Sequence, residues 1–213
     1  MAAKTILFDL DGTLTDSGPG IMNCAKMALE HYGIYVDNEK DLRTFVGPPL
    51  HDSFVRFGVP AEEADEAIRI YRSRYLTVGK FENTPYPGVR ELLEKLQRDG
   101  HKLYVATSKP ESTSIEILDH FDLAKYFTRI CGATMDRSRS SKEAVIAYLL
   151  ESADPGSEKI MVGDTAFDVI GANAHGIPAI GVSWGYGLVE DMQKAGAAAI
   201  ATSMDELYDI LTK

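Results

Sequence analysis

Cysteine is scarce in this sequence. The chain of 213 residues contains only Cys24 and Cys131, and they do not form a Cys-x-x-Cys motif. Two cysteines allow at most one disulfide, so the sequence excludes a fold that depends on a disulfide framework. Because free thiols are typical of a reducing compartment, we expect a cytoplasmic protein.

Runs of basic residues and long apolar segments are also absent. The 32 acidic residues outnumber the 22 basic ones, which gives a formal net charge of −10 that repels the phosphate backbone of nucleic acids. No apolar stretch reaches the roughly 20 residues that a membrane-spanning helix needs. Asp9 and Asp11 come too early for the apolar part of a signal peptide. We therefore expect neither a nucleic-acid partner nor a membrane partner. We also expect the protein to act as a monomer or homodimer.

The composition is that of a globular protein, with 45% hydrophobic and 25% charged residues. Short apolar segments alternate with amphipathic helical patterns along much of the chain. These segments are Lys4–Asp9, Lys102–Ala106, Lys159–Gly163 and Ala179–Ser183, with weaker ones at Arg129–Gly132 and Ala198–Ala201. Apolar runs of this length are typical of strands buried on both faces of a parallel sheet. The sequence therefore predicts an α/β fold with a doubly wound, Rossmann-like parallel sheet.

The pattern is different between the first predicted strand and residue 84. Four helices without an intervening strand are predicted there, at Ser17–Gly33, Asn38–Phe45, Leu50–Phe57 and Ala61–Val78. We expect a core domain formed by residues 1–15 and 84–213, and an inserted all-helical cap domain formed by residues 16–83. Ligands of open α/β sheets bind at the carboxyl ends of the strands, so an insertion at this point is expected to cover the site.

Two acidic motifs follow predicted strands. In the first, Asp9 and Asp11 alternate at the end of the first strand, so their side chains point to the same side. Two carboxylates that lie close together repel each other, and a bound cation relieves the repulsion. Oxygen ligands of this kind suit Mg²⁺. In the second motif, Asp164 ends a strand and Asp168 lies one helical turn later, close enough to bind the same ion directly or through water.

Two further segments have features of anion-binding sites. A predicted strand ends in Thr107–Lys109, where a hydroxyl group and backbone N–H groups face the start of a helix. Pro110 is expected in the first turn of that helix. Lys142 opens another predicted helix. A cation at a helix N-terminus is unfavourable, so Lys142 is expected to face a carboxylate, a phosphate or both.

The four motifs together resemble those of the haloacid dehalogenase-like hydrolase superfamily. The resemblance rests on Asp9–Ser17 (DLDGTLTDS), Thr107–Lys109, Lys142 and Gly163–Asp168 (GDTAFD), and it covers nearly the whole chain. The segments Val46–Leu50 (VGPPL) and Gly181–Gly187 (GVSWGYG) are similar to the phosphoglycolate phosphatase branch of that superfamily. Ser108 is a departure from the pattern, because many relatives have Asn there. Trp184 and Tyr186 are predicted to serve only in packing after a strand.

The resemblance implies a role for each motif. Asp9 would attack phosphorus and become an aspartyl-phosphate, and Asp11 would act as the general acid and base. Thr107, Ser108 and Lys142 would hold the phosphoryl oxygens. The metal site would comprise Asp9, the backbone carbonyl of Asp11, Asp164 and Asp168. The cofactor implied is Mg²⁺, and the expected partner is a small-molecule phosphorylated substrate such as phosphoglycolate, a sugar phosphate or a nucleoside monophosphate.

Three other functions remain open at this point. A β-phosphoglucomutase-like phosphomutase would retain both acids and the cap. A phospho-receiver domain also gathers acids, a Thr and a Lys at strand ends, but it lacks a helical insertion of this size. A non-catalytic binding protein would not need every one of these motifs.

Overall fold

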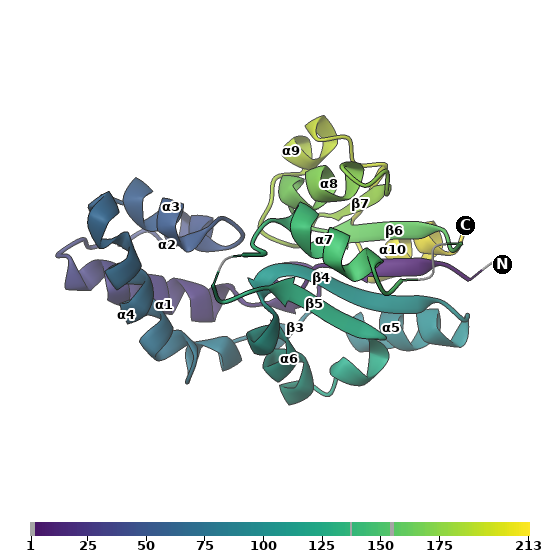
Figure 1. The fold of residues 1–213 in the computed structure, drawn as a ribbon, viewed down its shortest axis with the longest axis horizontal. Helices are drawn as coiled ribbons and strands as arrows, with labels where there is room; N and C mark the ends of the chain where they lie inside the picture. The colour runs from purple at the N-terminus through teal and green to yellow at the C-terminus, as the bar shows by residue number, and fades with distance from the viewer. Residues whose placement is uncertain (1–2, 137, 154–155) are drawn as a thin grey trace. The chain divides into compact units, whose positions relative to one another are not determined.

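The computed structural model describes residues 3–136, 138–153 and 156–213. The chain folds as two compact units, one comprising the chain up to Thr15 together with Pro85–Lys213, and the other comprising Asp16–Thr84. The first unit contains the large β-sheet, and the second is built from helices (Figure 1). Within the described residues, no helix has the length and apolar character needed to cross a membrane.

The sheet of the first unit has six parallel strands in the order β5-β4-β1-β6-β7-β8. The strands are β1 (Thr5–Phe8), β4 (Lys102–Pro110), β5 (Arg129–Ala133), β6 (Lys159–Gly163), β7 (Ala179–Val182) and β8 (Ala199–Ala201). Phe8 pairs with Val105 of β4 and with Val162 of β6, so β1 and β6 end side by side near the middle of the sheet, next to β4, which continues to Pro110. The predicted α/β fold with a doubly wound parallel sheet is confirmed.

Helices cover both faces of this sheet (Figure 1). They are α5 (Val89–Arg98), α6 (Glu111–His120), α7 (Lys142–Leu150), α8 (Ala166–Asn173), α9 (Val189–Lys194) and α10 (Met204–Leu211), with a short 3-10 helix, η4 (Ala124–Tyr126). Alternate residues of β1 enter two separate cores: Ile6 and Phe8 pack with side chains of α5 and α10, whereas Leu7 packs with those of α7, α8 and α9. Burial on both faces explains why the strands have continuous apolar sequences.

The second unit contains the helices α1 (Gly18–His31), α2 (Glu39–Leu42), α3 (Leu50–Arg56) and α4 (Ala64–Tyr75), with the 3-10 helices η1 (Arg43–Phe45), η2 (Ala61–Glu63) and η3 (Gly79–Phe81). Aromatic rings form part of its interior, where Phe54 contacts Phe45 and Tyr71 edge to face. Arg74 makes two hydrogen bonds to the carboxylate of Glu82, at 2.6 and 2.7 Å. This unit therefore has a core of its own.

Two short strands that the sequence pattern does not reveal lie where the chain passes from one unit to the other. They are β2 (Thr15–Asp16) and β3 (Thr84–Pro85), which pair as a separate two-stranded sheet. Two residues are too few to show a hydrophobic periodicity, so sequence analysis could not identify these strands.

Candidate active site

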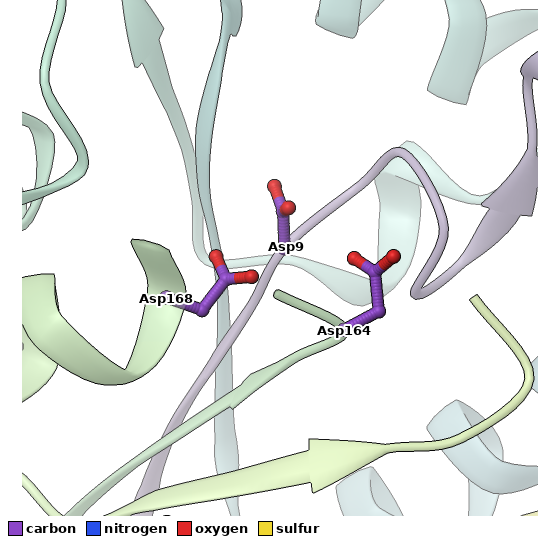
Figure 2. Close-up of side chains that lie close together, drawn as sticks. All are labelled: Asp9, Asp164 and Asp168. Atoms are coloured by element: carbon purple, nitrogen blue, oxygen red, sulfur yellow. The ribbon is translucent and has the colours of Figure 1, made fainter. Parts of the chain in front are cut away.

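Three carboxylates meet at the carboxyl ends of β1 and β6. Asp9 follows β1, Asp164 follows β6, and Asp168 lies in the first turn of α8. One carboxylate oxygen of each lies within 4.8 Å of those of the other two, and all three residues are buried (Figure 2). Parallel pairing of β1 with β6 brings the first two together, since the backbone N–H of Asp9 donates to the carbonyl of Val162 at 2.9 Å.

Lys142 brings a positive charge into direct contact with this cluster. It is the first residue of α7, and its Nζ lies 2.8 Å from Oδ1 of Asp9 and 2.7 Å from Oδ1 of Asp168. The same Nζ donates a hydrogen bond to the carbonyl of Ala106 at 2.9 Å. The two carboxylates provide the counter-charge that the position of Lys142 at a helix N-terminus requires.

Burial and like charges shift the pKa values of the cluster. Burial, followed by the charge of Asp168, raises the pKa of Asp9 to about 6, although Lys142 opposes the shift. Burial, followed by the charges of Asp168 and Asp9, raises the pKa of Asp164 to about 8. Burial alone would lower the pKa of Lys142, but Asp168 and Asp9 raise it above its usual range. The cluster therefore carries more negative charge than Lys142 balances.

Asp164 is fixed by groups from two other loops. Its Oδ1 accepts a hydrogen bond from the hydroxyl of Thr13 at 3.3 Å, and its Oδ2 accepts one from the backbone N–H of Tyr186 at 2.7 Å. Gly12, with φ +81°, lies so close that a Cβ atom there would collide with the Asp164 carboxylate. The turn after β1 thus needs glycine both for its backbone conformation and for the room that it leaves.

Asp168 has two functions in the structure. Its Oδ2 accepts hydrogen bonds from the backbone N–H and the hydroxyl of Thr165, at 3.0 and 2.8 Å, which caps the start of α8. Its Oδ1 faces Lys142. Gly163 leaves the space for this side chain, because a Cβ atom there would overlap with it. Asp168 therefore both caps α8 and orients Lys142.

The carboxylate of Asp11 lies outside the three-carboxylate cluster. Nζ of Lys109 donates to both of its oxygens at 2.8 Å. The predicted use of the Asp11 carboxylate as an acid and base is compatible with this separation, since a metal site would need only its backbone carbonyl. Lys109 is 8% exposed, so its side chain does not point into solvent.

The segment with the predicted phosphate-binding residues differs from expectation in its backbone. We predicted a strand with an apolar part at Lys102–Ala106 that ends in Thr107–Lys109, and β4 continues one residue further, to Pro110. Ala106 pairs with Cys131 and Pro110 pairs with Ala133, so the residues between them depart from the regular register. Pro110 is the residue before α6 and not part of its first turn. Thr107 is buried and its hydroxyl accepts a hydrogen bond from the N–H of Lys109 at 3.2 Å, whereas Ser108 is half-buried.

Sequence analysis missed three residues around Asp164. Thr13 and Tyr186 bind its carboxylate, and the indole N–H of Trp184 donates to the carbonyl of Thr13 at 3.2 Å. We expected Trp184 and Tyr186 to serve only in packing. The resemblance of the segment around them to one family branch was a signal that they lie near the site, but it did not reveal their partners.

The cluster fits a hard divalent cation. It offers carboxylate oxygens from Asp9, Asp164 and Asp168, and its burial, followed by the charges of Asp168 and Asp9, raises the pKa of Asp164. Oxygen donors and an uncompensated negative charge are the features that favour Mg²⁺. Such a cation would stabilise the ionised carboxylates by balancing their charge.

Comparisons with known proteins agree with this geometry. The model of the family described as haloacid dehalogenase-like hydrolase matches residues 6–182. The chain is also similar to a solved structure of a predicted phosphatase from Clostridium acetobutylicum, with 43% identity and a TM-score of 0.93 over 100% of this chain and 99% of that one.

Three curated relatives are named for different activities. The tyrosine-protein kinase PtkA of Mycobacterium tuberculosis is 43% identical over 98% of this chain and 72% of its own length. A 5'-nucleotidase of Pseudomonas aeruginosa is 41% identical over 88% of this chain and 86% of its own length. A phosphoglycolate phosphatase of Caulobacter vibrioides is 32% identical over 93% of this chain and 86% of its own length.

Proposed function

Because this chain belongs to the haloacid dehalogenase-like hydrolase family, we propose that it is a Mg²⁺-dependent phosphatase that hydrolyses a small-molecule phosphomonoester through an aspartyl-phosphate on Asp9. One observation carries the proposal. The buried carboxylate of Asp9 lies with Lys142 and two further carboxylates, whereas the carboxylate of Asp11 is held apart by Lys109. One acid is thus available for attack and another for proton transfer.

In the first step, a carboxylate oxygen of Asp9 forms a bond to phosphorus as the ester P–O bond breaks. Protonated Asp11 gives its proton to the departing alkoxide oxygen, which leaves as an alcohol. Lys142, which pairs with Asp9 in this structure, balances the negative charge that Asp9 and the phosphoryl group bring together.

In the second step, water attacks phosphorus and gives a proton to the Asp11 carboxylate. The bond between phosphorus and the Asp9 oxygen breaks, which releases inorganic phosphate and restores the Asp9 carboxylate. Asp11 ends the cycle protonated, ready for the next ester. The two steps consume one ester and one water molecule, and they form one alcohol and one phosphate.

The metal ion would be held by Asp9, the backbone carbonyl of Asp11, Asp164 and Asp168, the last directly or through water. A bound Mg²⁺ supplies charge neutralisation that makes attack by a carboxylate on a phosphate dianion feasible. Thr107, the backbone N–H of Ser108, and Lys142 would bind the phosphoryl oxygens.

Nucleoside 5'-monophosphates are the first substrates to test. The 5'-nucleotidase relative is 41% identical to this chain, against 32% for the phosphoglycolate phosphatase. The residues at the strand ends would bind only phosphate and metal. The helical unit Asp16–Thr84, as a cap, would then select the organic part of the substrate.

A phosphate-release assay tests the proposal. Nucleoside monophosphates, phosphoglycolate and sugar phosphates are incubated with the protein, with Mg²⁺ or with EDTA. Release that requires Mg²⁺ is expected from the wild type. Release from Asp9→Asn is expected to be abolished, while its circular dichroism spectrum stays that of the folded protein. Full activity in a folded Asp9→Asn variant would refute the mechanism.

The same preparations distinguish the two other candidate activities. Conversion of β-glucose 1-phosphate to glucose 6-phosphate would indicate the phosphomutase. The similarity to PtkA makes tyrosine phosphorylation the second activity to measure, with labelled ATP and a tyrosine-containing peptide. We expect neither product in amounts comparable to released phosphate.

A further inference from the structure

Trp184, the only tryptophan in the sequence, lies on the loop after β7. Its Nε1 donates a hydrogen bond to the carbonyl of Thr13, a residue 171 positions earlier in the turn after β1. Buried or half-buried indole groups usually find such a partner, so the bond alone does not indicate a function. What Thr13 contacts in turn makes the bond informative.

Thr13 connects this bond to the acidic cluster. Its side chain is buried and donates to Oδ1 of Asp164, while Tyr186, two residues after Trp184, donates its backbone N–H to Oδ2 of the same carboxylate. Both oxygens of Asp164 are thus oriented by residues of the two loops that Trp184 joins. Loss of the indole bond would free these loops to shift relative to each other.

The indole ring lies at the border of the hydrophobic core. Trp184 lines a cavity of about 610 Å³ together with Tyr86, Leu92, Met204 and Tyr208. The ring of Tyr86 contacts it edge to face, with the ring centroids 6.4 Å apart. Trp184 is half-buried against the hydrophobic core, and the hydrogen bond to Thr13 is the directional contact of its indole group that the structure shows.

We propose that Trp184 is a positioning residue for the metal site, which acts through Thr13 to hold the Asp164 carboxylate in the orientation that binds Mg²⁺. This inference rests on the proposed metal dependence. A residue beyond the ligands affects metal affinity by fixing the ligand's geometry before the ion arrives. Removal of one neutral hydrogen bond is expected to weaken Mg²⁺ binding about two- to tenfold.

The test measures Mg²⁺ binding to the substrate-free protein by isothermal titration calorimetry. The first variant is Trp184→Phe. In the second protein, benzothienylalanine replaces tryptophan during expression in a tryptophan auxotroph, which exchanges the indole N–H for sulfur and preserves the ring's shape. Because the chain has one tryptophan, only position 184 changes. The matched control is Tyr208→Phe, which alters another wall of the same cavity and removes a hydrogen bond to Asp99.

We expect the dissociation constant for Mg²⁺ to rise about two- to tenfold in both Trp184 proteins and to stay at the wild-type value in Tyr208→Phe. At saturating Mg²⁺, the KM for the phosphoester should be unchanged, since the phosphate-binding residues are intact. If Trp184→Phe does not fold, the isosteric protein decides the question.

Two results would overturn the inference, and they differ in what else they affect. If the wild type binds Mg²⁺ and the isosteric protein binds it equally well, only the role of Trp184 is refuted. If the wild type itself binds no Mg²⁺, the proposed metal dependence fails, and the role of Trp184 fails with it.

Discussion

At the scale of single residues, the main feature is a set of buried charges that do not balance. Asp9, Asp164 and Asp168 lie together, and in the described part of the chain Lys142 is the cation that pairs with this cluster, at Asp9 and Asp168, whereas Lys109 pairs with Asp11. Burying charges costs free energy unless they are paired, so the cluster destabilises the metal-free fold. Such destabilisation is common where residues are arranged for function.

The shifted pKa values give a prediction about pH. The pKa of Asp9 is raised to about 6 and that of Asp164 to about 8, from a usual value of 3.8. The folded state therefore keeps protons that the unfolded chain has already released. The stability that these two groups contribute is fully present below pH 3.8, the usual pKa that they have in the unfolded chain. It is lost as the pH rises through their pKa values in the folded state, about 6 for Asp9 and about 8 for Asp164.

We therefore expect the Tm of the metal-free protein to fall between about pH 5 and about pH 9, and we expect Mg²⁺ to raise the Tm more at the upper end of that range. Differential scanning calorimetry with and without Mg²⁺ measures both effects. Asp164→Asn should reduce both the pH dependence of the Tm and the increase in Tm that Mg²⁺ produces. An increase in Tm from Mg²⁺ that is equal at about pH 5 and about pH 9 would contradict the charge argument.

A second prediction separates the roles of Asp11 and Asp9. Asp11→Asn should slow the hydrolysis of alkyl phosphoesters by about 10²–10⁴-fold, because the leaving alkoxide no longer receives a proton. The defect should shrink with p-nitrophenyl phosphate, whose leaving group needs little protonation. Steady-state kcat/KM values on both types of ester provide the measurement. An equal defect on both would count against Asp11 as the general acid.

At the scale of elements, α7 begins with a residue that its own helix disfavours. A lysine at a helix N-terminus costs about 0.3–1 kcal/mol through the helix dipole. Asp9 from the end of β1 and Asp168 from α8 offset this cost, and Ser141 caps the helix by accepting a hydrogen bond from the N–H of Ala144 at 3.1 Å. The position of Lys142 therefore serves the site, and Ser141 serves the helix.

Substitutions at these two neighbours should therefore have different effects. Lys142→Ala should weaken the binding of every phosphorylated substrate about equally, because it removes a contact to the phosphoryl group that all of them share. Ser141→Ala should cost about 1 kcal/mol of stability and leave the relative kcat/KM values unchanged. Kinetics on several esters and urea denaturation of both variants test this. If the loss of kcat/KM in Lys142→Ala differs between substrates, Lys142 does not act through the phosphoryl group alone.

At the scale of the whole molecule, the chain has a sheet-containing unit and a helical unit with separate interiors. The two linkers near Thr15–Gly20 and Phe81–Pro87 are the predicted hinges of the helical unit, and β2 and β3 lie in them. If the helical unit acts as a cap, its closure would exclude water from the aspartyl-phosphate and present side chains to the organic part of the substrate.

Substitutions in the segment Arg43–Leu50 should therefore change the ranking of substrates and their KM values, but not the affinity for Mg²⁺. Arg43 and Pro49 are the best positions because their exposed side chains are not part of the unit's core, whereas Phe45 and Val46 are buried. Glu62→Ala, exposed elsewhere in the same unit, is the control. If the variants lose activity on all substrates equally and also lose Mg²⁺ binding, the segment instead belongs to the structural core of the protein.

The main strands, the α/β class and the family could be predicted from the sequence. Strands such as β6 could be predicted because burial on both faces leaves a continuous apolar run, which is a local pattern. The acidic motifs were visible for a similar reason, since each lies within a few residues at the end of one strand. Sequence also indicated that Lys142 needed a counter-charge, because the helix dipole is a local property.

Tertiary structure alone decided which groups meet. Lys109 pairs with Asp11 across 98 residues of chain, Thr13 binds Asp164 across 151, and Trp184 reaches Thr13 across 171. These contacts depend on the order of strands in the sheet and on the paths of the loops after them. Neither is encoded in the periodicity of any one segment, so the partners of Asp11 and Asp164 became known only when the strand ends were brought together.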